Sequence, residues 1–372
     1  MPRPLEALFV SEGALGTQVL GPLRAEAGSG ALHVPDLHVR VVRLPPMGVA
    51  ARLAVRDVPG LKRLDLDIAT VRWHLAQGLR LRRALRAARA AGPVEVVYVN
   101  THTLALFAQP ELSGLPTVLL ADAAVWAWHA MGIWRPVHRH SRTMLAPSLR
   151  RERRALAHAR RVVALTPWSA ETLRAAEPSA RIVVHHPGLD LERFRPAKRA
   201  PRRRVRVLFV GARFVQKGGP ELLDALAPRL GRDVELDVVS PAPIEPRPGV
   251  RSHRLSPDDP RLVALFQQAD LLCLPTRGDA TPWVVLEAMA CGTPVIATAV
   301  GGIPDLIGGE GGRTVPAGDR AALAAALDEL IANPDQRAAL GQAARTRCER
   351  CYDGRRQGPR LAAILREAAG VR

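Results

Sequence analysis

Residues 271–298 constrain the fold more than any other stretch of this sequence. Their apolar runs and turn residues predict a strand, a loop, a helix, a glycine stop and a second strand, at 271–275, 276–281, 282–291, 292 and 294–298. Elements in this order make up one unit of a parallel sheet. The sequence therefore predicts an α/β protein with at least one parallel sheet.

Two acidic residues lie in this unit, Asp279 in the loop and Glu287 in the helix. Thr281 is expected to cap the helix and Pro282 to occupy its first turn. Ligands of open α/β sheets bind outside the carboxyl ends of the strands, where this loop lies. An ionised carboxylate accepts hydrogen bonds from two neighbouring hydroxyls. Either acid taken alone is better interpreted as an ordinary surface residue, but their positions allow the two acids to face one ligand.

A second candidate site follows the strand predicted at 205–210. Arg213, Lys217, Gly218 and Gly219 lie between this strand and a helix that is expected to begin at Pro220. A cation and two glycines directly before a helix N-terminus suit a diphosphate. Lys217 would supply a mobile point charge and Arg213 a planar, bidentate donor.

The string from Asp279 to Ile296 resembles the donor-site signature of family 4 retaining glycosyltransferases, which have two Rossmann-like domains in the GT-B arrangement. The resemblance implies that Glu287 holds the ribose of a nucleotide. Asp279 stands where the family has a glutamate that meets the transferred sugar. Ala280-Thr281-Pro282 replaces a glycine-rich turn, and Pro282 removes one backbone N–H.

The same resemblance covers other loops of this half of the chain. Lys217 matches the lysine of the family, whereas Arg213 stands one position later than its arginine. The run from Val300 to Asp305 resembles a Gly-Gly-x-Pro-Glu turn, with backbone N–H groups beside the donor. The further donor-binding residues that the resemblance implies are Gly218, Gly219, Thr281, Trp283, Val284, Gly301 and Gly302.

The N-terminal half offers fewer candidates. Gly13 and Gly16 follow the first predicted strand, and the resemblance implies that this loop faces the acceptor or the donor phosphates. Asp122 follows a strand predicted at 116–121. In the family a His or Asp near this place touches the sugar, so Asp122 is the candidate and His129 the alternative. Three tryptophans follow, at 126, 128 and 134. They either form an apolar wall around an acceptor or pack between the domains.

Basic residues are concentrated in two segments of this half, and the chain carries a net charge of +18. Residues 72–89 contain six arginines and no acid, and residues 135–161 contain nine arginines and one acid, Glu152. These segments are either solvated faces or a contact with an anionic membrane surface. The chain has three lysines among 53 basic residues, a bias that codon composition can produce, and we do not expect a nucleic-acid partner.

Localisation is predicted from the apolar runs. None reaches the roughly 18 residues of a membrane span, and no secretory signal is evident at the N-terminus. A cytoplasmic protein is expected, at most peripheral at the inner face of the membrane. Cys348 and Cys351 form a lone C-x-x-C, which we interpret as helix positions rather than as a metal or redox site.

Three segments are expected: an acceptor-side Rossmann-like domain at 1–196, a donor-side one at 197–351, and a helix at 352–372 that crosses back. The resemblance implies an active cleft between the domains and a retaining hexosyltransferase, of EC 2.4 type, that uses a nucleotide-diphosphate sugar without a metal cofactor. The acceptor is a glycan, a lipid-linked sugar or a small molecule. The alternatives are a non-catalytic protein of this fold that binds anionic membrane or nucleic acid, and a phosphorylase or epimerase of the same architecture.

Overall fold

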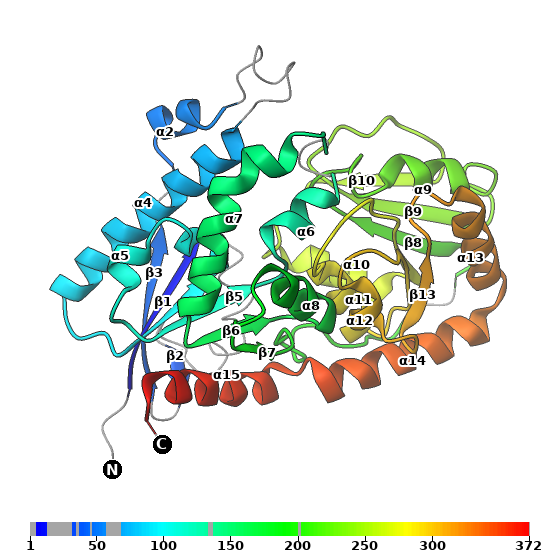
Figure 1. Cartoon of the computed structure of the whole chain (residues 1–372). Helices are drawn as coiled ribbons and strands as arrows, with labels where there is room; N and C mark the ends of the chain where they lie inside the picture. The colour runs from blue at the N-terminus through cyan, green and yellow to red at the C-terminus, as the bar shows by residue number, and fades with distance from the viewer. Residues whose placement is uncertain are drawn as a thin grey trace. The chain divides into compact units, whose positions relative to one another are not determined.

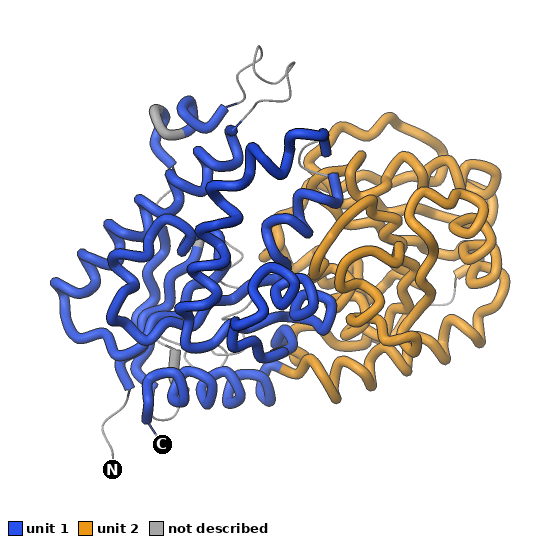
Figure 2. Tube along the Cα trace, viewed as in Figure 1, with its two compact units in different colours: residues 1–188, 354–372 blue, residues 189–353 orange. Residues whose placement is uncertain are grey.

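The computed structural model describes residues 5–12, 32–34, 37–44, 47–56, 68–132, 137–199 and 202–371. These residues divide into two compact units, 1–188 with 354–372, and 189–353 (Figure 2). The division at 188/189 lies eight residues before the expected boundary at 196/197. The last helix is part of the first unit, since its residues fall within 354–372.

Unit 1, residues 1–188 and 354–372, is built on a seven-stranded sheet of order β2-β3-β1-β4-β5-β6-β7 (Figure 1). Among the described strands of this sheet, only β2 is antiparallel to its neighbour. The strands are β1 (Leu5–Glu12), β2 (Leu32–Val34), β3 (Leu37–Leu44), β4 (Val96–Asn100), β5 (Thr117–Ala121), β6 (Arg161–Ala164) and β7 (Ile182–Val184). The helices are α2 (Val49–Ala54), α4 (Ala69–Ala90), η1 (His102–Ala105), α5 (Gln109–Leu112), α6 (Val125–Ala130), α7 (Ser141–His158), α8 (Pro167–Ala176) and α15 (Gly354–Ala369).

Helices cover both faces of this sheet. Leu81 and Leu85 of α4 and Leu156 of α7 form a core with one set of strand side chains. Leu361 and Leu365 of α15 form a second core with the opposite set. Successive side chains of a strand point to opposite faces, so a parallel strand buried on both sides is apolar almost throughout. The β4 strand, in which all five residues are buried, follows this rule.

Unit 2, residues 189–353, carries an all-parallel six-stranded sheet of order β10-β9-β8-β11-β12-β13. The strands are β8 (Val205–Val210), β9 (Val234–Val239), β10 (Val250–His253), β11 (Leu271–Leu274), β12 (Val295–Thr298) and β13 (Gly312–Val315). The helices are α9 (Gly219–Leu226), α10 (Pro260–Gln268), α11 (Trp283–Ala290), α12 (Ile303–Ile307), α13 (Arg320–Ala332) and α14 (Pro334–Cys351). The predicted strand, helix and strand of residues 271–298 are thus confirmed, with ends within about one residue.

Arginine side chains hold several turns of unit 2 together through backbone carbonyls. Arg345 donates to the carbonyls of Phe194 and Ala290 at 2.9 and 2.8 Å. Arg199 donates to the carbonyls of Gln267 and Gly292 at 3.0 and 3.1 Å. Because a guanidinium has five donors in a fixed plane, one side chain can satisfy several carbonyls at once. Part of the arginine excess therefore has a structural role.

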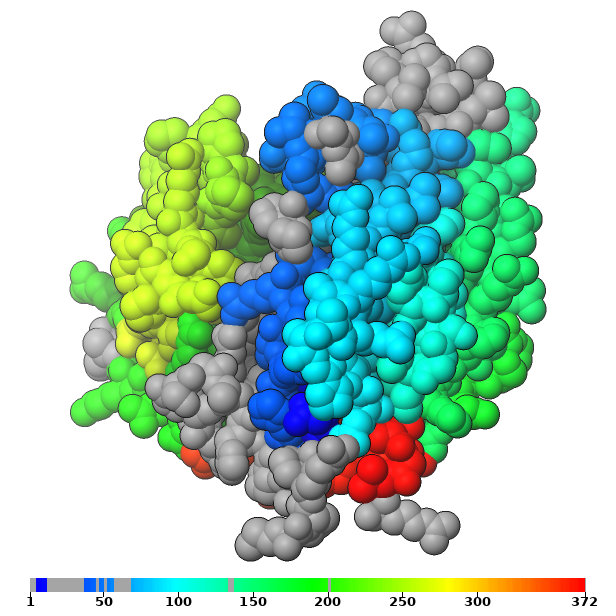
Figure 3. Space-filling view, turned by 90° about the vertical axis from the view of Figure 1, so that its left-hand side faces the viewer, coloured from blue at the N-terminus to red at the C-terminus, as the bar shows by residue number. Residues whose placement is uncertain are grey.

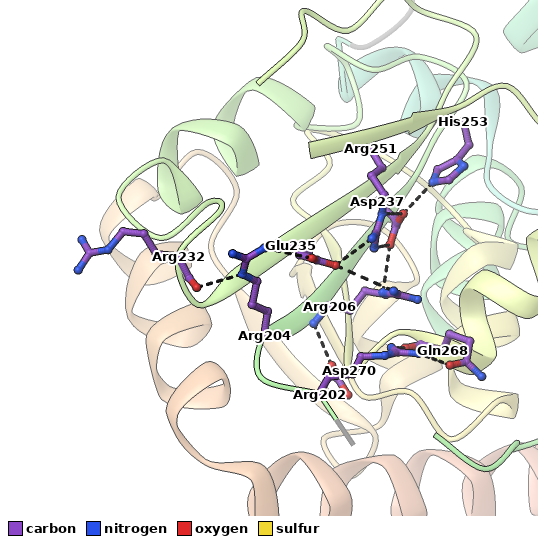
Figure 4. Close-up of polar contacts among 10 residues, drawn as sticks. All are labelled: Arg202, Arg204, Arg206, Arg232, Glu235, Asp237, Arg251, His253, Gln268 and Asp270. Carbon is purple, nitrogen blue, oxygen red and sulfur yellow. Dashed lines mark hydrogen bonds and ion pairs between the residues drawn. The ribbon is translucent and has the colours of Figure 1, made fainter. Parts of the chain in front are cut away.

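An ion-pair network lies on β8, β9 and β10 (Figure 4). The Asp237 side chain is 1% exposed and accepts two hydrogen bonds from Arg251, at 2.9 and 2.8 Å, and one from His253 at 2.7 Å. Arg206 approaches the same carboxylate at 3.5 Å. Burial by itself raises the pKa of Asp237, but these donors outweigh it and hold the pKa below its ordinary value.

Candidate functional site

The candidate site of unit 2 lies where the strand order of its sheet reverses. The chain runs from β8 to β9 and β10 on one side, and then continues with β11, β12 and β13 on the other. Neighbouring β8 and β11 mark the point of reversal, and in open α/β sheets ligands bind outside the carboxyl ends of the strands at such a point. The loops after β8, β11 and β12 meet at this edge.

Glycines allow these loops to touch. Gly218 has φ +81°, and a Cβ there would overlap the carbonyl oxygen of Pro275. Gly301 has φ +57°, and a Cβ there would overlap the carbonyl oxygen of Asp279. Gly302 donates its N–H to the carbonyl of Ala280 at 2.9 Å. Only glycine combines a positive φ with such close approach, so these residues fix the spacing of the three loops.

Lys217 and Asp279 form an ion pair at the centre of this edge. The Lys217 ammonium donates to Oδ2 of Asp279, although the two residues are 62 positions apart in the sequence. Their side chains are 24% and 11% exposed. Burial is the largest influence on Asp279 and raises its pKa, while Lys217 and the N–H groups of Ala280 and Thr281 only partly oppose this. The carboxylate thus has less stabilisation than it would have in water.

Glu287 lies on the inner side of α11 and is 6% exposed. Burial raises the pKa of its carboxyl to about 7, and the charge of Arg193 lowers it only in part. Within the described part of the chain, no group of the protein donates a hydrogen bond to this carboxylate. Buried polar groups normally have partners, so an acid in this state indicates a site for a ligand with hydroxyl or N–H donors.

Thr281 does not cap α11, which corrects the expectation from the sequence. The helix begins at Trp283, and its N-cap is Pro282 with an extended ψ of 110° and no side-chain capping bond. The start is one residue later than expected, so the Thr281 hydroxyl lies outside the capping position. This hydroxyl is buried and has no hydrogen-bond partner among the described residues. Trp283 and Val284 are half-buried and pack against the core of unit 2.

The loop between β8 and α9 leads into a helix that begins at Gly219, one residue before the expected Pro220. Gly218 is the N-cap of α9, and Lys217 precedes it. A Cβ on Gly219 would overlap the ring of Phe214, so this position is also restricted to glycine by packing. Arg213 is exposed, and its carbonyl accepts the Lys217 N–H at 2.9 Å. This backbone hydrogen bond joins Arg213 and Lys217 within one turn of the loop.

The candidates of unit 1 lie at the carboxyl end of β5. The Asp122 carboxylate accepts a hydrogen bond from Nε1 of Trp128 at 3.0 Å. The His129 ring lies 5.7 Å from that of Trp126, and the Arg142 guanidinium lies 4.5 Å above the same tryptophan. Gly13, Gly16 and Trp134 lie outside the described residues.

A buried polar cluster that was not predicted from the sequence lies at the same edge of unit 1. Thr101 has φ +97°, and no other described residue except glycine has a positive φ. His102 follows it and contacts the Glu152 carboxylate at 2.8 Å, and both side chains are 1% exposed. Glu152 also accepts the N–H of Val125 at 2.7 Å. One carboxylate therefore ties the turn after β4 to the start of α6.

A signal for this cluster was present in the sequence. Glu152 is the single acid in an arginine-rich segment, and it falls at helical spacing from residues that α7 buries, Ser141, Leu145, Ser148, Ala155 and Leu156. A lone acid on the apolar side of a helix indicates a buried partner. Strained backbone such as that of Thr101 gathers at functional sites, so this edge of unit 1 is a second candidate region.

Comparison with known proteins agrees with this geometry. Residues 204–333 match the family model described as glycosyl transferases group 1. The D-inositol 3-phosphate glycosyltransferase of Saccharomonospora viridis is 34% identical over 251 residues, which are 58% of this chain and 58% of that protein. The chain thus spans little more than half the length of this relative.

Solved structures share the fold over nearly the whole chain. Sucrose-phosphate synthase from Thermosynechococcus elongatus has a TM-score of 0.74 at 19% identity and covers 98% of each chain. Anabaena Alr3699/HepE, solved in complex with UDP, has a TM-score of 0.67 at 16% identity, with 98% of this chain and 100% of that one covered. The predicted α/β fold class with two Rossmann-like domains is confirmed. The region that matches glycosyl transferases group 1, residues 204–333, includes Lys217, Asp279 and Glu287.

Proposed function

We propose that this protein is a retaining glycosyltransferase of family 4 that moves a hexose-type sugar from a nucleotide-diphosphate sugar to an acceptor. The observation that carries the proposal is the ion pair of Lys217 with Asp279 in the loops after β8 and β11, with the buried Glu287 on the helix that follows the second of these loops. All three lie within the region that matches glycosyl transferases group 1. The cation of Lys217 suits a diphosphate, and the carboxylates of Glu287 and Asp279 suit the hydroxyls of a ribose and of a sugar.

Each of these residues takes one part of the donor in the proposed reaction. Lys217 and the N-terminal N–H groups of α9 stabilise the negative charge that develops on the departing diphosphate. Glu287 accepts hydrogen bonds from the ribose hydroxyls, and Asp279 accepts them from the transferred sugar. The acceptor attacks from the face that the diphosphate leaves, which retains the anomeric configuration. Protein cations supply the positive charge, so the proposal needs no divalent metal.

Unit 1 supplies the candidate residues for the acceptor. Asp122 and the tryptophans of α6 provide a carboxylate and aromatic surface, which suit a polyhydroxy compound. Relatives are named as D-inositol 3-phosphate glycosyltransferases, so this phosphorylated polyol is the first acceptor to test. Lipid-linked sugars and glycans are the next.

Nucleotide binding tests the proposal directly. We expect UDP, GDP or ADP, or its sugar conjugates, to raise the unfolding temperature, since a ligand at 100 times its Kd stabilises the native state by about 2.7 kcal/mol. UDP is tried first, because HepE was solved with it. In the matched variant Glu287→Gln, which keeps the shape and removes the charge, the shift at pH 8 should shrink. A well-folded protein that responds to none of the nucleotides would overturn the proposal.

We also propose that unit 1 contacts anionic membrane surfaces through α2, α4 and α7. The described residues include no helix that is long and apolar enough to span a membrane. Large apolar side chains that are exposed on α2 and α4 include Val49, Leu53, Leu75 and Leu79. Exposed arginines of α4 and α7 are Arg83, Arg86, Arg89, Arg142, Arg150, Arg153 and Arg154. Figure 3 shows the surface that the blue and cyan segments from α2 to α5 present on this unit.

Vesicle binding tests this contact. Each basic residue near an anionic leaflet contributes about 1 kcal/mol, so Arg150→Gln with Arg154→Gln should weaken binding to phosphatidylserine vesicles roughly 10- to 30-fold. Sedimentation at 0.1 M salt measures the effect. The control exchanges two exposed arginines of unit 2, Arg247 and Arg254, for glutamine and should leave binding unchanged. Equal losses in both variants would indicate a nonspecific charge effect and contradict the proposed surface.

A further inference from the structure

The ion pair between Lys217 and Asp279 joins two groups that the proposed function assigns to different parts of the donor. Lys217 is assigned to the diphosphate and Asp279 to the sugar, yet in this structure the ammonium donates to the carboxylate. A nucleotide sugar brings an anion for Lys217 and hydroxyl donors for Asp279. A nucleoside diphosphate, the product, brings the anion alone. The pair is therefore affected differently by donor and product.

We propose that Asp279 makes the site discriminate between the nucleotide sugar and the nucleoside diphosphate, by competing with the diphosphate for Lys217. When the donor binds, the sugar hydroxyls replace Lys217 as the partners of Asp279, and Lys217 turns to the phosphates. When the sugar has been transferred, Asp279 loses these hydroxyls. Its carboxylate then faces an anion and takes Lys217 back, which favours release of the product.

Packing keeps the stem of Lys217 and the carboxylate of Asp279 close to one another. The ammonium can therefore turn between the carboxylate and the phosphates without leaving the site. A Cβ on Gly211 would lie 3.1 Å from Cγ of Lys217, which places the stem of the lysine directly against this backbone. The carbonyl of Asp279 lies against Gly301, and its side chain is 11% exposed. A carboxylate with so little exposure to solvent gains little hydration when Lys217 leaves it, and an unpaired buried charge is costly.

The loop after β11 increases the dependence of the phosphates on Lys217. Pro282, the N-cap of α11, has no N–H to offer to an anion at this helix end. The Thr281 hydroxyl is buried rather than directed to a cap. With fewer backbone donors in this loop, the phosphates depend more on Lys217 and on the N–H groups of α9, so competition by Asp279 for Lys217 has a larger effect on anion affinity.

This inference rests on the proposed function, and one set of titrations distinguishes the failure of each. Calorimetry measures Kd for a nucleoside diphosphate and for its sugar conjugate, using the nucleotide found in the stability screen. In Asp279→Asn we expect the diphosphate to bind about tenfold tighter, while the nucleotide sugar binds equally or less tightly. The ratio of the two Kd values should therefore shift by at least about tenfold towards the product.

Two variants complete the design. Glu221→Gln removes one negative charge from the first turn of α9, where Glu221 pairs with Arg277, and should leave the ratio of the two Kd values unchanged. Asp279→Glu keeps the carboxylate and should keep the preference for the nucleotide sugar. A parallel change in both Kd values of Asp279→Asn, or no change in either, would overturn the inference while the proposed function stands. A wild-type protein that binds neither ligand would overturn both.

Discussion

Replacing Lys217 with methionine is expected to lower the rate of sugar release from the bound donor by roughly 10²- to 10³-fold. Removing one preorganised group that stabilises developing charge costs about 2.7–4 kcal/mol in the transition state. Methionine keeps the apolar stem that packs against Gly211, so the loop after β8 should keep its form. The measurement is single-turnover release of nucleoside diphosphate at saturating donor, which isolates the chemical step from binding.

The same substitution leaves Asp279 without its cation, and the controls separate this effect from catalysis. Lys217→Arg keeps the charge and should recover part of the rate. The double variant Lys217→Met with Asp279→Asn removes the uncompensated carboxylate, so its unfolding temperature should be higher than that of Lys217→Met while its rate stays low. A rate for Lys217→Met within about threefold of the wild type would assign the diphosphate charge to another group, and Arg213 would be the first to examine.

Local chemistry made the elements around the candidate site predictable. The strand, loop, helix and strand of residues 271–298 are defined by apolar runs, a proline and a glycine that are close in sequence, and the structure follows them within about one residue. The helix start differs because Pro282 adopts an extended ψ, which no local pattern specifies. The β3 strand was not predicted, although Leu37, Val39 and Val41 alternate with polar residues as in a half-buried strand.

The contacts that give the site its properties are not local. Lys217 and Asp279 come from loops 62 positions apart, and only the adjacency of β8 and β11 brings them together. A resemblance between motifs predicted a ligand for each of them but not that they pair with one another. Glu152 was similarly judged by its arginine-rich neighbours in sequence, whereas its partners His102 and Val125 lie 50 and 27 positions away.

Replacing Asp237 with alanine is expected to destabilise unit 2 by about 3–5 kcal/mol. The substitution leaves Arg251, Arg206 and His253 around a site that held a nearly fully buried carboxylate, and breaking a buried ion pair from one side has this cost. Hydrogen exchange of peptides from β9 and β10 is the suitable measurement, because it reports on this unit alone in a chain that has two.

The control is Asp328→Ala, which also removes an aspartate paired with an arginine. The Asp328 side chain is 64% exposed, so its loss should cost at most about 1 kcal/mol of stability.

The pH dependence of stability gives a second test of Asp237, because the pKa of its carboxyl is held below the ordinary value. Its ionised form stabilises the fold above about pH 4 and loses this effect as the pH falls through the lower, native pKa. The difference between wild type and Asp237→Ala should therefore shrink on acidification, and a difference that stays constant would show that packing around Asp237, rather than its charge, holds β9 and β10 together.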